Sequence, residues 1–290
     1  MGYGYLLLQA LIFSFGGILI KTAAGTFSPF QVSFLRFAIG VVILLGLQLL
    51  REKRVHLTLG DRVIVFGGAA KALHYLGENY GVTHGFSYGN VIIWPVQTVV
   101  ILLLSVLVLR ERVSLRSALG AGLCVGGIGL LTWNGAPAAE FLAGQGPLLL
   151  SFVLAGVGAA LFSVAQKKRL DRMGTVELNN SMFLVGGAFT ALSLPVTEPP
   201  AALGLPAAAA MLILGAITAL GFLLQAEALK TVPIFAATVV QSSTVLLSLV
   251  WAALLYRERI TVWIILGAAL FLIGILCVNL KTKPTGGKES

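Results

Sequence analysis

The chain has 290 residues, of which 58% are hydrophobic and only 11% are charged, and its formal net charge at pH 7 is +9. A soluble domain does not need so much apolar surface, whereas a protein that lies in a bilayer does. In a soluble protein the positive charge could indicate nucleic-acid binding. Here most basic residues fall in short stretches between long apolar segments. We therefore expect a polytopic membrane protein that has the lipid bilayer as a partner and does not bind nucleic acid.

Ten apolar segments, each long enough to cross a membrane, follow one another along the chain. A spanning helix needs about 20 mostly apolar residues, and the sequence lacks the alternating pattern of transmembrane β-strands. The first segment has neither a basic start nor a small-residue cleavage site, which favours a span over a signal peptide. The sequence thus predicts an all-α protein with ten transmembrane helices. The segments are 3–22, 29–50, 63–82, 86–109, 115–134, 147–166, 178–197, 206–229, 234–256 and 261–280.

A repeat with a period of 147 residues divides the chain into two halves. Arg110-Glu111-Arg112-Val113 follows the fourth segment, and Arg257-Glu258-Arg259-Ile260 follows the ninth. Such self-similarity indicates a duplicated architectural unit. Because each half contains an odd number of spans, the second half enters the membrane from the opposite side, which makes an inverted repeat. We predict repeats at 1–134 and 147–280, a linker at 135–146 and a polar tail at 281–290.

The glycines of the fifth and tenth segments are part of the same repeat. Gly120 and Gly127 match Gly267 and Gly274 at this period. Glycines in membrane helices permit close backbone approach, either inside one chain or in a homodimer, and the sequence leaves both open. Cys124 and Cys277 also lie among apolar residues, where a thiol behaves as a small hydrophobe. With no Cys/His cluster and no nucleotide motif, we expect no metal and no cofactor.

The distribution of basic residues predicts the orientation in the membrane. With the N-terminus in the cytoplasm, the predicted cytoplasmic loops and tail contain fifteen Lys and Arg residues, and the outer loops contain three. Cytoplasmic loops of membrane proteins carry such an excess. The prediction is a multi-pass protein of the plasma membrane, the inner membrane in a bacterium, with both termini in the cytoplasm.

The third segment carries the densest set of polar side chains. Lys71, His74, Tyr75 and Glu78 recur at the spacing of one helical face, and ionisable residues inside a span usually serve a function. Lys71 could bind or couple a substrate, or it could be paired internally or snorkel. Glu78 could bind an ammonium group, carry a coupling proton together with His74, or be structural.

Further candidates lie in the fourth, eighth and ninth segments. The repeat period places Thr218, Phe222 and Gln225 opposite the stripe of the third segment. Trp94 could stack on an aromatic side chain or an organic cation, although Trp is also common at membrane interfaces. Gln97 and Gln241 could bind a polar end of a substrate by hydrogen bonds.

Two charged residues are secondary candidates. Arg36 lies about 10 Å along its helix from Pro29, and a structural or snorkelling role competes with a role in the site. Glu227 lies three residues before Lys230 near a predicted span end. An interfacial i, i+3 pair explains Glu227, and its helical position turns it away from Gln225.

The chain resembles the EamA family of the drug/metabolite transporter superfamily over nearly its whole length. The resemblance is carried by Ser14-Phe15-Gly16-Gly17, by Leu35-Arg36-Phe37, and by Leu109-Arg110-Glu111-Arg112 with Leu119-Gly120-Ala121 and its repeat. Arg110 and Arg257 replace the family's usual glycine, and Ser242 stands where the first half has Pro95. The family implies ten helices and transport of small metabolites, often amino acids moving outward. Arg36 matches an Arg common in its second helix, and Trp94-Pro95 is similar to its aromatic amino-acid exporters.

The sequence therefore predicts a secondary transporter, not an enzyme, that exports amino acids, including aromatic ones, by alternating access through a cavity between the halves. One alternative is a carrier of organic cations or amines that uses Glu78 and an aromatic wall. A second alternative, of a different class, is a lipid-handling membrane subunit. His74 with Glu78 is the only approach to a catalytic pair, which is thin support for an enzyme.

Overall fold

The computed structural model describes residues 1–85, 92–107, 110, 114–133, 135, 137, 146–200, 203–256 and 261–279. Within these ranges the chain is helical and contains no β-strand. The helices are α1 (Gly2–Phe13), α2 (Gly16–Ala23), α3 (Pro29–Glu52), α4 (Arg62–His84), α5 (Ile93–Leu107), α6 (Leu115–Trp133), α8 (Gly146–Arg169), α9 (Thr175–Ala191), the 3-10 turn η2 (Leu194–Val196), α10 (Leu205–Leu229), α11 (Ile234–Gln241), α12 (Thr244–Tyr256) and α13 (Val262–Asn279). The second Arg-Glu-Arg copy, most of the first, most of the linker and the tail lie outside the described residues.

Every one of the ten predicted segments contains helix. Five helical stretches are long and apolar enough to cross a membrane, and α6 and α13 contain shorter apolar stretches. The polar stripe in α4 gives this 23-residue helix a lower hydropathy than a purely apolar span. The five stretches are Gly2–Ala23, Pro29–Glu52, Pro147–Arg169, Leu205–Leu229 and Ile234–Leu255.

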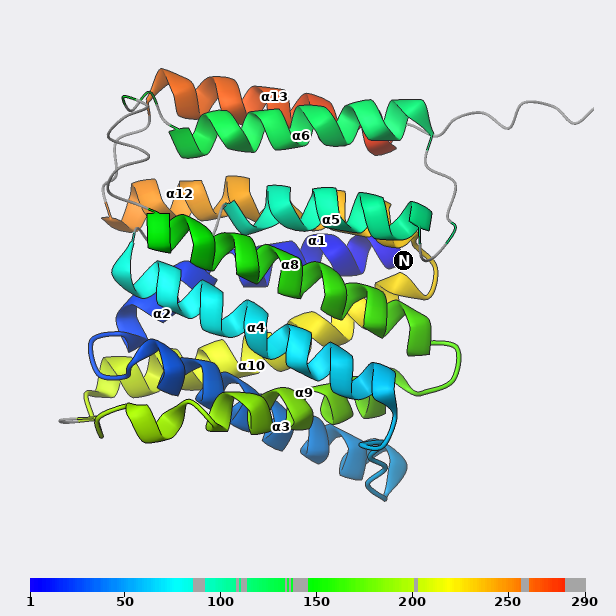
Figure 1. Cartoon of the computed structure of the whole chain (residues 1–290), viewed down its shortest axis with the longest axis vertical. Coiled ribbons are helices and arrows are strands. Elements are labelled where there is room, and N and C mark those ends of the chain that lie inside the picture. Colours follow the sequence, from blue (N-terminus) through cyan, green and yellow to red (C-terminus); the bar gives the residue numbers. More distant parts are fainter. Residues whose placement is uncertain are drawn as a thin grey trace, which may run out of the picture.

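The helices lie in stacked layers with their axes roughly aligned (Figure 1). The pair formed by α6 and α13 lies at one end of the stack, and α3 and α9 lie at the other. Helix α4 packs against α8, α9 and α3, while α1 packs against α10, α11 and α12. Segments from both halves of the sequence therefore enclose the centre of the molecule.

Helices α3 and α4 begin at well-defined caps. At the start of α3 the Ser28 hydroxyl accepts a hydrogen bond from the Gln31 backbone N–H, and the Gln31 side chain accepts one from the Ser28 N–H. This capping box satisfies N–H groups that have no partner inside the helix. At the start of α4 the Asp61 carboxylate accepts from the Val63 N–H at 2.7 Å. The caps fix where the two helices that carry the charged candidates begin.

Two of the predicted spans are interrupted. The first is divided into α1 and α2 at Ser14, and the ninth into α11 and α12 at Ser242. Each serine hydroxyl donates to a carbonyl in the preceding turn, Leu11 at 2.6 Å and Thr238 at 2.9 Å, and such bonds bend helices. The Trp251 indole N–H of α12 donates to the Ser14 hydroxyl at 2.8 Å. The broken first span is thus held by the second half of the broken ninth.

Helices α6 and α13 pack through the glycines of the repeat. A Cβ atom at Gly127 would lie 2.6 Å from the Gly267 carbonyl oxygen, and one at Gly274 would lie 2.6 Å from the Gly120 carbonyl oxygen. These cross-pairings mean that the two helices run antiparallel. The close packing predicted from the glycines is confirmed, and it occurs inside one chain. Cys124 lies in the same contact, with its thiol 3.6 Å from the Phe271 carbonyl oxygen.

Candidate functional site

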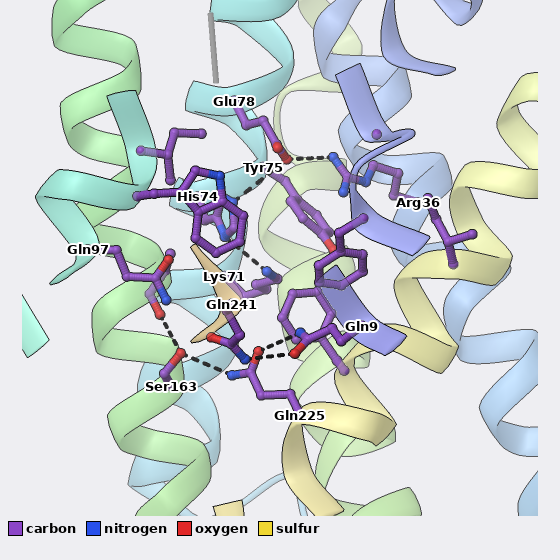
Figure 2. Close-up of a pocket in the computed structure, with 17 residues that line it drawn as sticks. Gln9, Arg36, Lys71, His74, Tyr75, Glu78, Gln97, Ser163, Gln225 and Gln241 are labelled. Atoms are coloured by element: carbon purple, nitrogen blue, oxygen red, sulfur yellow. Dashed lines mark hydrogen bonds and ion pairs between the residues drawn. The ribbon is translucent and has the colours of Figure 1, made fainter. Parts of the chain in front are cut away.

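A cavity lies among helices of both halves (Figure 2). It brings together all nine residues proposed as substrate-binding and also Arg36, whereas Glu227 is not among its lining residues. The lining residues are Gln9, Phe13, Gly16, Arg36, Lys71, His74, Tyr75, Glu78, Ile93, Trp94, Gln97, Ala159, Ser163, Ile217, Phe222, Gln225 and Gln241. Figure 2 shows Arg36 and Glu78 at one end, the glutamines Gln9, Gln225 and Gln241 at the other, and the rest of the α4 stripe between them.

Arg36 of α3 is the centre of the charged end. Its Nη1 donates to the Glu78 carboxylate at 2.8 Å and to the Asn79 side-chain oxygen at 3.0 Å. Its Nε donates to the Thr218 hydroxyl at 3.3 Å, and its Cζ lies 3.7 Å from the centre of the Tyr75 ring. Of the roles considered for Arg36, that of a structural partner agrees with these contacts. Glu78 is therefore a paired carboxylate, which lowers the cost of its burial.

Lys71 of α4 is completely buried, so it does not snorkel. Its Nζ lies 3.5 Å from the centre of the Phe222 ring, 4.3 Å from that of Tyr75 and 5.0 Å from that of Phe162. The faces of aromatic rings attract cations. Lys71 is thus held by rings from α4, α8 and α10, and its polar partner is His74 Nδ1 at 2.9 Å.

His74 lies between Lys71 and Glu78 on the same helical face. Its Nε2 is 3.7 Å from Glu78 Oε2, beyond hydrogen-bond distance. The side chains of His74 and Glu78 are each 12% exposed, more than those of their neighbours Arg36 and Lys71. His74 and Glu78 are therefore the members of the charged group that a bound molecule can contact most directly.

Buried side-chain amides form the opposite end of the cavity. The Gln241 amide of α11 donates to Gln9 at 2.7 Å, and Gln9 of α1 donates to Gln225 of α10 at 3.0 Å. Gln225 in turn donates to the Ser163 hydroxyl at 3.0 Å and to the Gln166 oxygen at 3.1 Å. A connected network of this kind satisfies groups that would otherwise be costly to bury. It joins α1, α8, α10 and α11 without using a charge.

Apolar and aromatic side chains complete the walls. The Phe13 ring of α1 lies 5.0 Å from the Phe222 ring, measured between ring centres. Trp94 and Ile93 enter from the start of α5, and Ile217 enters from α10. The cavity therefore offers a charged face, an amide end and an apolar wall to one small molecule. This combination is typical of ligand pockets.

Sequence reasoning missed two parts of the site. Gln9 was not a candidate, although a glutamine inside an apolar segment is a signal that could have been used. The contact of Arg36 with Glu78 joins residues 42 positions apart, and no local spacing indicates it.

Glu227 accepts hydrogen bonds from Thr175 at 2.6 Å and from Lys230 at 2.9 Å at the end of α10, so the predicted i, i+3 pair is confirmed.

Among the residues that the structure describes, no three His, Cys, Asp or Glu side chains come together. The two cysteines are free thiols. The chemistry that the cavity offers is recognition by ion pairs, hydrogen bonds and aromatic contact.

An all-helical membrane protein whose two halves enclose such a cavity has the architecture of a membrane transporter of small molecules. The sequence profile of the EamA-like transporter family matches residues 1–133 and 146–280. The chain belongs to this family.

One individual protein with a similar sequence agrees with this assignment, and one solved structure has a similar fold. A protein of Clostridium kluyveri described as an uncharacterized transporter is 26% identical over an aligned length of 284 residues, and the alignment covers 94% of this chain and 91% of that protein. A solved crystal structure superposes with a TM-score of 0.78 over 96% of this chain and 97% of that chain, at 19% sequence identity. The latter likeness concerns the fold alone.

Proposed function

We propose that this protein is a secondary transporter that exports amino acids, including those with aromatic side chains, across the plasma membrane. The observation that carries the proposal is that a basic and an acidic side chain, Lys71 and Glu78, share one face of α4, with the imidazole of His74 between them. This face lines a cavity that also contains aromatic walls. An amino acid has a carboxylate and an ammonium group on the same carbon atom, so its charges can match neighbouring groups of opposite sign.

In this proposal the substrate's carboxylate lies at the Lys71–His74 side of the face and its ammonium group approaches Glu78. The apolar side chain of the substrate then packs on Phe222 and Trp94, since aromatic rings stack favourably on one another. The charges of the site support this orientation. The described lining residues carry two basic side chains, Arg36 and Lys71, against one carboxylate.

Alternating access is proposed to use the two interrupted spans. Gly16, beside the first break, and Gln241, beside the second, both line the cavity. Discontinuous helices at the interface of inverted repeats form binding sites in several transporter folds. A change of bend at the breaks would open one side of the cavity and close the other. We place both termini in the cytoplasm, and a homodimer stays a prediction.

The test is transport by purified protein in liposomes. Vesicles loaded with an unlabelled amino acid take up its radiolabelled form by exchange if the protein carries it. We expect uptake of phenylalanine or tryptophan by the wild type and a loss of at least tenfold in Glu78→Gln. The matched control is Glu227→Gln, which changes the same side chain outside the cavity and should retain uptake. No uptake of any amino acid under any imposed gradient would contradict the proposal.

Glu78 and the aromatic wall also suit a carrier of organic cations or amines. The two basic side chains of the lining, Arg36 and Lys71, weigh against it, because they repel a simple cation and attract a carboxylate that such a substrate lacks. Uptake of a quaternary amine and not of amino acids would favour this function. Unchanged metabolite efflux with altered membrane lipids in a deletion strain would instead favour a lipid-handling subunit.

A further inference from the structure

The contact between Lys71 and His74 determines which nitrogen atom of the imidazole carries the proton. A lysine ammonium has three donors and no acceptor, whereas a neutral imidazole has one donor nitrogen and one acceptor nitrogen. Lys71 Nζ lies 2.9 Å from His74 Nδ1. If Lys71 is charged, Nδ1 must be the acceptor and the imidazole proton must be on Nε2.

Aromatic rings surround the Lys71 ammonium group and offset part of the cost of its complete burial. Three aromatic rings lie within 5.0 Å of its Nζ, with the closest, Phe222, at 3.5 Å. Ring faces stabilise an ammonium ion by cation–π attraction, and a neutral amine would gain nothing comparable. Lys71 is also completely buried, whereas His74 is partly exposed and lies between Lys71 and Glu78. His74 is therefore the member of this pair that is more accessible to a molecule in the cavity.

We propose that Lys71 is a positioning residue that holds His74 in the tautomer with its proton on Nε2, and that His74 donates this proton in a hydrogen bond to the substrate's carboxylate. The inference deepens the proposed function and rests on it for the identity of the substrate. In this inference Lys71 positions His74 and does not contact the substrate itself. It also makes His74 a fixed neutral donor and not the carrier of a coupling proton.

Lys71 and Arg36 oppose the protonation of His74, whereas Glu78 favours it but is already paired with Arg36. Lys71, Tyr75 and Glu78 come from its own helix, and Arg36 comes from α3. The lining residues contributed by α1, α2, α5, α8, α10 and α11 are uncharged. A second proton on the ring would have to occupy Nδ1, which would break the bond from Lys71 and place a third positive charge beside Lys71 and Arg36. Substrate binding should therefore change little across the pH range in which a free histidine titrates, near pH 6.5.

The chain allows a direct measurement because it has only three histidines. His56 is exposed on the loop after α3, and His84 is at the end of α4 with its ring near the Tyr80 carbonyl oxygen. In the double variant His56→Gln/His84→Gln, labelling with ¹⁵N-histidine reports His74 alone. We expect the full-length protein in lipid to show a protonated Nε2 and an unprotonated Nδ1 between pH 5.5 and 7.5.

Two variants of Lys71 complete the spectroscopic test. Lys71→Met removes the donor, and we expect mixed tautomers or a doubly protonated ring near pH 5.5. Lys71→Arg retains a donor, and we expect it to restore the protonated Nε2 at least in part. A proton on Nδ1 in the wild-type cavity, or an unchanged tautomer in Lys71→Met, would overturn the inference.

Substrate binding supplies a second and separate measurement. Addition of a transported amino acid should move the Nε2 signal, and no movement at saturation would overturn the contact with His74. The KM for uptake should vary less than about twofold between pH 5.5 and 7.5 in the wild type. In Lys71→Met it should vary several-fold, because the fraction of protonated histidine then falls from about nine tenths at pH 5.5 to about one tenth at pH 7.5. If liposomes transport no amino acid, the proposed function fails, while the tautomer result stands or falls independently.

Discussion

The α6–α13 pair and the cluster around Arg36 show two ways to hold helices together in one membrane protein. In the pair, backbones approach at Gly120, Gly127, Gly267 and Gly274, and the contact is made without charged groups. Around Arg36, α3, α4 and α10 are joined through a guanidinium, a carboxylate, an amide and a hydroxyl. Close packing of small residues is sufficient for stability. Charged groups are costly in a membrane, so their presence in the cluster around Arg36 indicates function.

The largest effect that we expect comes from removing the centre of the polar cluster. Arg36→Met leaves the Glu78 carboxylate buried without its partner, which should lower stability by about 3–5 kcal/mol and abolish transport. Thermal unfolding in detergent measures the loss of stability. The double variant Arg36→Met/Glu78→Gln removes both charges and should regain much of the stability but not the transport. If the double variant is as unstable as the single one, the cluster is not held by this ion pair.

The glycine-packed pair should be sensitive to a single methyl group. Gly127→Ala places a Cβ atom 2.6 Å from the Gly267 carbonyl oxygen and the Phe271 nitrogen. Overpacking of this kind should cost about 1–3 kcal/mol without changing substrate specificity. Gly122→Ala is the control on the same helix, because a Cβ atom there has no atom within 4 Å. Equal melting temperatures for the two variants would show that the close contact of α6 with α13 does not limit stability.

The amide network should respond more weakly than the charged cluster. Gln9→Leu removes the donor to Gln225 and the acceptor of Gln241. We expect a loss of about 1–2 kcal/mol, because two buried amides lose one partner each. Gln9→Glu tests the same position with a similar shape but a negative charge, and it should weaken amino-acid uptake further. Full uptake by both variants would mean that this end of the cavity does not contact the substrate.

The smallest effect concerns the pair at the start of α4, outside the membrane-spanning part. Arg169 donates to Asp61 at 2.8 Å, and this hydrogen bond holds the pKa of the Asp61 carboxyl below its usual value. The pKa of Asp61 is lower in the folded protein than in the unfolded chain, where it is about 3.9. The Asp61–Arg169 pair therefore stabilises the fold fully above the unfolded-state pKa, and this contribution is lost as the pH falls through the folded-state pKa.

The wild type should therefore lose about 0.5 kcal/mol more stability on acidification than Asp61→Asn does. Melting curves between pH 5 and pH 3 measure it, with the exposed Asp171→Asn as the control. A wild-type dependence on pH that is identical in Asp61→Asn would assign the acid sensitivity to other carboxyl groups.

The sequence predicted the helical segments well because apolar length and turn signals are local properties. It also predicted which residues of α4 share one face, since helical spacing alone places Lys71, His74, Tyr75 and Glu78 together. The interruptions at Ser14 and Ser242 were not predicted. Each depends on a hydroxyl that bonds within its own helix, and the first also on Trp251 of another helix.

By itself, then, the sequence determined the class of the protein, the helical segments and the face of α4 that carries polar residues. These follow from hydropathy and from the fixed geometry of the helix, which require no knowledge of neighbours. Only the tertiary structure decided how the charges are used: Arg36 pairs with Glu78, Lys71 lies behind His74 among three rings, and Gln9 joins the site. Arg36 and Glu78 are 42 positions apart and Gln9 and Gln225 are 216 apart, and they meet only because packing brings α1, α3, α4 and α10 around one cavity.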